Sequence, residues 1–178
     1  PAFVEGAIQT INNSVSRMNN LLRKLQRNEP EGVRVLNLQE VLVEAIKRCQ
    51  KEQPLPTLRN EHTEARVKGD WDSLVMVFVH LIQNAQDATP SNGFIDLNVQ
   101  RDRNLVTITI EDNGEGMDAD FIRNRLFKPF DTTKTGKGMG IGVYQARDYI
   151  QALGGNISVE SIKGEGTTFT LSLPLVLS

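Results

Sequence analysis

Residues 112–142 decide how this chain folds, because two glycine-rich turns flank a polar loop there: Asp112-Asn113-Gly114-Glu115-Gly116-Met117 and Gly138-Met139-Gly140-Ile141-Gly142. The alternating segment Leu105 to Glu111 predicts a strand whose end fixes the carboxylate of Asp112. A carboxylate held there can accept a hydrogen bond from an exocyclic amine. We expect the glycines after it to let a ring approach the backbone.

The second turn opens an apolar-periodic segment, Ile141 to Leu153, which predicts a helix. The free N–H groups and the dipole at the start of that helix favour an anion, so residues 138–142 form a candidate phosphate site. Gly-x-Gly also occurs in ordinary turns. A P-loop is excluded because the Gly-Lys-[Ser/Thr] ending is absent, and a Rossmann site because the polar stretch Asp118 to Lys137 replaces a bare strand.

Composition limits the class of protein. A chain of 178 residues suits one globular domain with an appendage. The net charge of −2 gives no basic footprint for nucleic acid. The single cysteine, Cys49, excludes a disulfide framework and suits a reducing compartment. The longest apolar run, Leu74 to Ile82, is too short to span a membrane, and the start at Pro1 leads us to expect a piece of a longer protein.

The N-terminal segment Phe3 to Gln26 carries a heptad stripe, which predicts a long helix. Its apolar positions are Val4, Ile8, Ile11, Val15, Met18, Leu22 and Leu25. The stripe could pack on the domain's own core, but three unbroken heptads favour association with another helix. Asn28 to Gly32 is typical of a linker, so we divide the chain into residues 1–30 and 31–178.

Further elements follow from caps and alternation. Helices are predicted from Asn37 to about Lys51, with a capping-box-like start, from Trp71 to Ala88 after the cap Asp70, and over Ala119 to Leu126. Short strands are predicted over Val33–Leu36, Thr57–Asn60 and Ala65–Lys68, and hairpins over Phe94–Asp112 and Gly155–Leu173.

Polar residues of two segments add to the candidate site. His80, Asn84 and Asp87 share one helix face, and taken singly each is typical of a solvated or satisfied group. Beside the glycine turns, Asn84 becomes an oxygen ligand suited to Mg²⁺. In the loop 126–134, Phe127 and Phe130 can anchor the chain, while its polar residues Thr132, Thr133 and Lys134 can contact a polyphosphate. We interpret this loop as a lid, with an ordinary surface loop as the alternative.

Five segments, in the family's order, resemble the N, G1, F, G2 and G3 boxes of bacterial sensor histidine kinases. They are His80 to Ala85, Asp112-x-Gly114-x-Gly116, Phe127 to Phe130, Gly138-x-Gly140-x-Gly142 and Gly164-x-Gly166-Thr167-Thr168-Phe169. Any one box is weak evidence, but five in order are specific. The lid is similar to that of nitrogen-regulation-type kinases, and overall likeness points to kinases associated with exosortase and exopolysaccharide clusters.

The resemblance implies an α+β chain with the Bergerat-type fold shared by gyrase, Hsp90 chaperones, histidine kinases and MutL. This fold is a two-layer α/β sandwich, a mixed sheet with helices on one face, here preceded by a long N-terminal helix. Asp112 would read the adenine amine, helped by Thr167 or Thr168 through water, and Asn84 would hold Mg²⁺. The implied nucleotide-binding residues are Asn84, Asp87, Asp112, Gly114, Gly116, Met117, Phe127, Phe130, Thr132, Thr133, Lys134, Gly138, Met139, Gly140, Ile141, Gly142, Thr167 and Thr168.

The implied function is that of a protein-histidine kinase catalytic domain, which transfers the γ-phosphate of ATP to a histidine outside this chain for relay to a response regulator. Residues 4–26 resemble the second helix of the dimerisation and phosphoacceptor hairpin, which implies a homodimer through residues 4–25. We expect this domain on the cytoplasmic side, with the parent protein anchored in the bacterial inner membrane.

Two departures from the family pattern matter. The phosphoacceptor histidine is absent, since only His62 and His80 are available, so we do not expect autophosphorylation. His80 also stands four residues before Asn84, where gyrase-type ATPases place a water-activating glutamate, so we expect slow hydrolysis and favour transfer to a partner's histidine. A gyrase/MutL-class ATPase, an anti-sigma-type serine kinase and a scaffold with a dead nucleotide site remain as alternatives.

Overall fold

A computed structural model describes residues 2–25, 32–60, 63–128 and 141–177. The chain divides into two compact units, Pro1–Glu31 and Gly32–Ser178. The described residues of the first unit form the helix α1 (Ala2–Leu25), over the segment with the heptad stripe. No helix among the described residues is long and apolar enough to cross a membrane.

The second unit is built on a mixed five-stranded sheet. The strands are β2 (Pro56–Leu58), β4 (Ile95–Asp102), β5 (Leu105–Asp112), β7 (Gly166–Pro174) and β6 (Asn156–Ile162), in that spatial order. β2 pairs with β4 in parallel, and the other neighbours are antiparallel. A separate two-stranded sheet pairs β1 (Arg34–Asn37) with β3 (Arg66–Gly69). Both predicted hairpins are therefore present.

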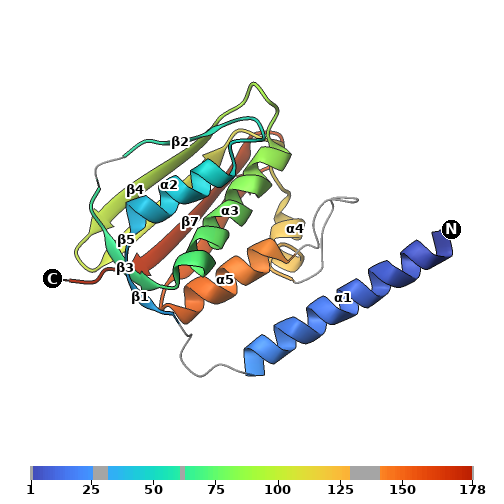
Figure 1. Cartoon of the computed structure of the whole chain (residues 1–178). Helices are drawn as coiled ribbons and strands as arrows, with labels where there is room; N and C mark the ends of the chain where they lie inside the picture. Colours follow the sequence, from blue (N-terminus) through green and yellow to red (C-terminus); the bar gives the residue numbers. More distant parts are fainter. Residues whose placement is uncertain (1, 26–31, 61–62, 129–140, 178) are drawn as a thin grey trace. The chain divides into compact units, whose positions relative to one another are not determined.

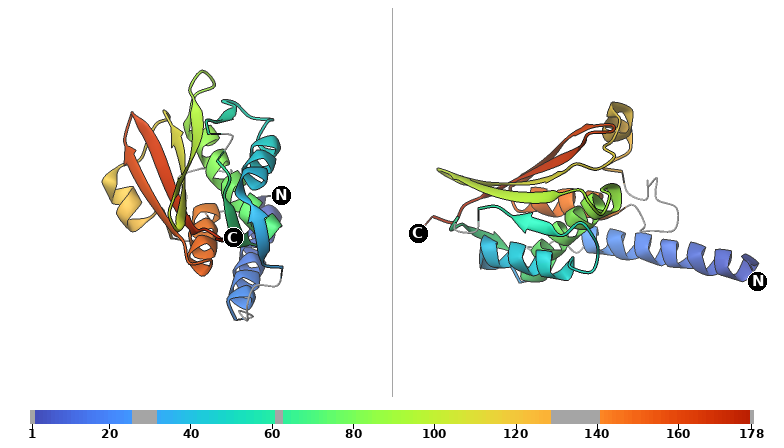
Figure 2. Two further views of the ribbon diagram at one scale, coloured as in Figure 1. Left: turned by 90° about the vertical axis from the view of Figure 1, so that its left-hand side faces the viewer. Right: turned by 90° about the horizontal axis from the view of Figure 1, so that it is seen from above.

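Three helices cover one face of the five-stranded sheet, which gives the expected two-layer sandwich (Figures 1 and 2). They are α2 (Leu38–Arg48), α3 (Trp71–Ala88) and α5 (Gly142–Ala152), while the short α4 (Ala119–Asn124) lies at the β6 side of the sheet. Alternation along the strands explains the layering. In β5, Val106, Ile108 and Ile110 are buried, whereas Thr107 and Thr109 between them are only partly buried.

Side-chain caps fix where α2 and α3 begin. Asn37 Oδ1 accepts a hydrogen bond from Gln39 N at 3.0 Å, and Asp70 Oδ2 accepts one from Ser73 N at 2.9 Å. The backbone N–H of Asp70 also donates to the Tyr149 hydroxyl on α5 at 2.7 Å. The start of α3 is therefore tied to the end of α5, and the two helices run side by side (Figure 1).

Two helices end earlier than the sequence predicts. α2 stops at Arg48, where the backbone N–H of Cys49 bonds to Ile46 O, and not at Lys51. α4 stops at Asn124: the Arg125 N–H makes the last regular helical bond, to Phe121 O at 2.9 Å, and the Leu126 N–H donates to that same oxygen at 2.9 Å, five residues back, so the regular ladder ends there. Leu126 is nevertheless buried, so the apolar periodicity correctly identified a core residue that lies beyond the end of the helix.

A buried glutamine holds the loop after α2 against α3. Gln86, which is 6% exposed, donates from Nε2 to the carbonyl oxygens of Cys49 (2.9 Å), Glu52 (3.0 Å) and Pro54 (3.3 Å). Turning the amide over would set Oε1 against these acceptors, so the contacts fix its orientation. Gln86 thus satisfies carbonyl groups that no helix or strand can satisfy.

We expect Gln86→Leu to lower the free energy of unfolding by about 1–3 kcal/mol, because it leaves buried carbonyl oxygens without their donor. Urea unfolding measures this change. Gln83→Leu, at an exposed position of the same helix, is the matched control and should stay close to the wild type. Equal stability of the two variants would contradict the role given to Gln86.

Candidate functional site

Asp112 ends β5 on the helix-covered face, where the sequence predicts it, and is 6% exposed. Its Oδ1 accepts a hydrogen bond from Gly114 N at 2.8 Å. Burial raises the pKa of this carboxyl, and the neighbouring Glu111 adds to the shift, while the N–H groups of Gly114 and Thr167 and the Thr89 hydroxyl oppose it. The structure therefore holds an acceptor in a place where its charge is poorly solvated.

The Thr89 hydroxyl approaches this carboxylate from the end of α3. Thr89 is 6% exposed, and its Oγ1 is buried without a partner that meets strict hydrogen-bond geometry. Its effect on the pKa of Asp112 is accordingly that of a nearby donor rather than of a well-formed hydrogen bond. Thr89 could not be predicted from the sequence, because only the folded chain brings the end of α3 beside the end of β5.

Strand register separates the two candidate threonines. Asp112 pairs with Thr167 across β5 and β7, and both residues are buried on the same face. Thr168 pairs with Glu111 and, by the alternation of strand side chains, points to the opposite face. Of the two threonines expected to assist Asp112, Thr167 therefore lies on the same face of the sheet as the carboxylate.

A serine on β6 joins the two turns beside Asp112. Ser161 Oγ lies 2.8 Å from Met117 N, 2.8 Å from Gly166 O and 2.8 Å from Thr167 Oγ1. The expected site residue Met117 thus contributes its backbone N–H, and its side chain packs against the core. Ser161 was missed by sequence reasoning, and only its register opposite Thr167 could have marked it.

The glycines after Asp112 allow close packing within the chain. A Cβ at Gly114 would overlap Ala88 O, and Gly116, at φ +66°, would set a Cβ against Ile162 O. These two glycines were expected to admit a ring of a ligand. In the direction in which a Cβ would project, each of them meets a neighbouring segment of the chain itself, the end of α3 for Gly114 and the adjoining ends of β6 and β7 for Gly116.

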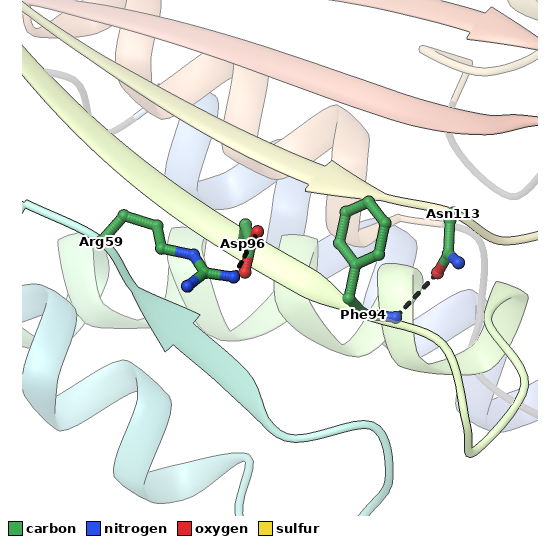
Figure 3. A network of polar contacts seen from close by, with 4 residues as sticks. All are labelled: Arg59, Phe94, Asp96 and Asn113. Carbon is green, nitrogen blue, oxygen red and sulfur yellow. Dashed lines mark hydrogen bonds and ion pairs between the residues drawn. The ribbon is translucent and has the colours of Figure 1, made fainter.

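The turn after β5 is also held from the side of β4. Asn113 Oδ1 accepts a hydrogen bond from Phe94 N at 2.7 Å, and Figure 3 shows this contact beside the pair formed by Arg59 Nη2 and Asp96 Oδ2 at 3.0 Å. The ion pair links the residue after β2 to β4, and its exposed arginine makes it a weak contributor to stability. The Asn113 contact fixes the turn that follows Asp112.

Part of the predicted lid can be placed. Phe127 packs against the core, and Arg147 Cζ of α5 lies 4.6 Å from the centroid of its ring, within cation–π distance. The beginning of the loop is thus attached to the helix that follows it. The other predicted residues of this region, Phe130, Thr132, Thr133, Lys134, Gly138, Met139 and Gly140, lie outside the described residues.

The start of α5 faces the polar side of α3. Ile141 occupies the N-cap position of α5 without a side-chain cap, and a Cβ at Gly142 would lie 3.2 Å from His80 Cγ. Burial lowers the pKa of His80, so its imidazole is neutral at pH 7. Asn84, partly buried one turn further along α3, and the exposed Asp87 each have polar interactions of their own.

Among the described residues, no group of three or more histidine, cysteine, aspartate or glutamate side chains could hold a metal ion. Asn84 remains a candidate for an ion that takes few protein ligands, and Mg²⁺ has this property.

Comparisons with known proteins identify kinases among the relatives. The chain is 37% identical over 108 residues to sporulation kinase A of Bacillus subtilis (strain 168), covering 61% of this chain and 18% of that protein. It is 34% identical over 113 residues to the sensor histidine kinase ZraS of Escherichia coli (strain K12), covering 64% and 24%. The chain therefore spans less than a quarter of the length of either relative.

Solved structures share the fold. The catalytic domain of histidine kinase ThkA matches with a TM-score of 0.65 and 27% identity, over 80% of this chain and 97% of that one. The mycobacterial sensor histidine kinase MprB matches with a TM-score of 0.69 and 21% identity, over 82% and 99%, which supports the fold alone. The resemblance to sensor histidine kinases is confirmed, while its nitrogen-regulation and exosortase details stay predictions.

The family described as "Histidine kinase-, DNA gyrase B-, and HSP90-like ATPase" matches residues 69–177, from the end of β3 to the segment after β7. Because this match covers more than half of the 178 residues, the chain belongs to that family.

Proposed function

We propose that residues 31–178 are the ATP-binding catalytic domain of a two-component sensor histidine kinase, which transfers the γ-phosphate of ATP to a histidine outside this chain. The observation that carries the proposal is the buried carboxylate of Asp112, which pairs across the sheet with Thr167. The chain that holds this carboxylate belongs to an ATPase family. The sensor kinases among the relatives supply the reaction class.

Adenine recognition would rest on Asp112. A carboxylate whose pKa is raised by burial lacks solvent donors, so a nucleobase amine that donates to it replaces missing hydration. Gly114 N holds Oδ1 in a fixed direction at 2.8 Å. The site would therefore be preorganised, and little ordering would be required when the base arrives.

The triphosphate would lie toward α5 and α3. The start of α5 has no side-chain cap and no acidic residue in its first turn, which favours an anion there. Asn84 would offer its amide oxygen to Mg²⁺, which when bound neutralises charge on the phosphates. Residues of the lid, Thr132, Thr133 and Lys134, would contact the same phosphates.

Transfer is favoured over hydrolysis by the residue at position 80. A neutral histidine packed against Gly142 stands where the family's ATPases are expected to carry a carboxylate that activates water. This chain would hold the triphosphate in position and neutralise its charge, while the imidazole of another polypeptide attacks the γ-phosphorus in line.

The rest of the parent protein belongs to the same proposal. Residues 1–30 would be the second helix of the dimerisation and phosphoacceptor hairpin with its linker, and a homodimer would form through residues 4–25 of α1. A response-regulator receiver domain would be the next acceptor. The domain would work on the cytoplasmic side of a parent protein anchored in the inner membrane.

Asp112→Asn should weaken the binding of ADP in the presence of Mg²⁺ by about 10- to 100-fold, because the hydrogen bond to a charged acceptor is lost. Calorimetric titration of the whole chain measures this change. The control is Asp102→Asn, an exposed carboxylate that accepts from Arg103 N in the β4–β5 turn, and it should bind like the wild type. Equal affinities for the wild type and Asp112→Asn would remove the adenine contact from the proposal.

The raised pKa of Asp112 also predicts a pH dependence of stability. The folded chain binds this proton more tightly than the unfolded chain, whose carboxyl titrates near its usual pKa of 3.8. The free energy of unfolding therefore loses a contribution as the pH rises from 3.8 through the raised pKa, and the loss persists at neutral pH. Asp112→Asn lacks this titration.

Urea unfolding between about pH 4 and about pH 7 tests the sign of this linkage. The stability of the wild type relative to Asp112→Asn should fall as the pH rises. If the difference in the free energy of unfolding between the wild type and Asp112→Asn stayed constant, or grew in favour of the wild type as the pH rises, the carboxylate would not be destabilised by its burial.

The transfer reaction is tested by mixing the chain with labelled ATP, Mg²⁺ and a separate hairpin polypeptide of the parent protein that carries the acceptor histidine. We expect label on the hairpin in an acid-labile, base-stable form, and less label released as inorganic phosphate. Steady release of phosphate without labelled hairpin would instead support the gyrase/MutL class of ATPase.

A further inference from the structure

The end of the second unit that lies opposite α4 brings together separate parts of the chain (Figures 1 and 2). The small β1–β3 sheet, the β4–β5 turn and the segment after β7 meet there, and we call this surface the basic end. Three hydrogen bonds hold these parts to one another. They are Arg101 Nη1 to Glu64 O (3.0 Å), Leu175 N to Asn104 O (2.8 Å) and Val176 N to Arg66 O (2.8 Å).

The basic end carries a local excess of positive charge that the sequence as a whole conceals. Its segments are residues 33–37, 64–68, 101–105 and 174–177. They hold two carboxylates, Glu64 and Asp102, and five cations, Arg34, Arg66, Lys68, Arg101 and Arg103. The surplus of three positive charges stands against a net charge of −2 for the whole chain. None of the five cations forms an ion pair with another described residue, so the potential at this end is positive.

Aliphatic side chains are exposed beside these cations. The inner face of the β1–β3 sheet is buried through Leu36 and Val67. Val35 and Lys68, which pair directly in the register, therefore project from the opposite, solvent face. Val35 is 49% exposed, and Leu177, one residue beyond the bond from Val176 to β3, is 59% exposed. The basic end thus presents cations and apolar groups together.

We propose that the basic end docks the domain on a membrane surface that contains anionic lipids. Lipid phosphates complement the surplus of positive charge, and Val35 and Leu177 enter the boundary between headgroups and acyl chains. The four segments contain no aromatic residue, so the surface lacks the stacking groups of a site for single-stranded nucleic acid. The combination of exposed aliphatic groups with unpaired cations is what favours a lipid surface over a partner that offers charge alone.

Docking at this end leaves the candidate nucleotide site free. β5 runs from Leu105 at the basic end to Asp112, and seven steps of about 3.4 Å along a strand separate the two residues by about 24 Å. The Asp112 end of the sheet would therefore point away from the lipid. The inference does not rest on what Asp112 binds, and ADP should not change the affinity of the chain for vesicles.

The experiment measures sedimentation of the whole chain with vesicles of equal parts phosphatidylglycerol and phosphatidylcholine, and with vesicles of phosphatidylcholine alone. We expect binding to the anionic vesicles only, weakened by added salt. A triple variant, Arg66→Gln with Lys68→Gln and Arg103→Gln, should bind at least about tenfold more weakly, because each cation near an anionic surface contributes about fivefold. The matched control removes three exposed cations elsewhere and should bind like the wild type. It is Lys47→Gln with Arg123→Gln and Lys163→Gln.

A second variant separates lipid from charge alone. Val35→Thr with Leu177→Ser keeps every cation and should weaken binding by about three- to tenfold, because it removes apolar area that would leave water. Unchanged binding in this variant would assign the basic end to another anionic partner, such as an acidic protein, and would overturn the inference.

Two further results would also overturn it. One is a wild type that does not bind the anionic vesicles, and the other is equal binding by the two triple variants, which would place the contact on another surface. Circular dichroism checks that each variant is folded. If the triple variant at the basic end does not fold, the single variants Lys68→Gln and Arg103→Gln take its place, each with an expected loss of about fivefold. Loss of vesicle binding in any of these variants leaves ADP binding, and so the proposed function, intact.

Discussion

The site depends on a contact of backbone against backbone between the turn after β5 and the β6–β7 turn. A Cβ at Gly116 would overlap Ile162 O, and one at Gly166 would overlap Asp112 O. Both glycines have positive φ, +66° and +140°, which side chains disfavour. The Gly164 N–H donates to Glu115 O at 2.6 Å across the same contact. Any side chain at Gly116 or Gly166 would separate the strand end that carries Asp112 from the strand that carries Thr167.

Once the two turns meet, hydrogen bonds replace the solvent that Asp112 loses. Gly114 N, the Thr167 N–H and the Thr89 hydroxyl all lower the pKa of its carboxyl, yet burial outweighs them and the net shift is upward. The folded chain therefore carries a carboxylate that is less stable than one in water. Groups of this kind cost stability, and a ligand that supplies the missing donor would offset that cost, which fits the adenine contact proposed for Asp112.

Sequence patterns predicted the elements that local chemistry determines. α3 begins after the Asp70 cap and ends at Ala88 as predicted, because a cap and a dense apolar pattern agree there. Both hairpins and the place of Asp112 also followed from alternation. Contacts that depend on strand register could not be predicted in this way. The choice between Thr167 and Thr168, the role of Ser161 and the approach of Thr89 require knowledge of which strands pair and where they stop.

A chemical double-mutant cycle measures whether Asp112 meets the amine of the base. Titrations of ADP and of purine riboside diphosphate, which lacks the amine, into the wild type and Asp112→Asn give four dissociation constants. The wild type should lose affinity when the amine is absent, and Asp112→Asn should discriminate less between the two nucleotides, because its neutral amide oxygen is a weaker acceptor than the carboxylate. If Asp112→Asn discriminated between them as strongly as the wild type, another group would read the amine, and Asp112 would not be the residue that meets the base.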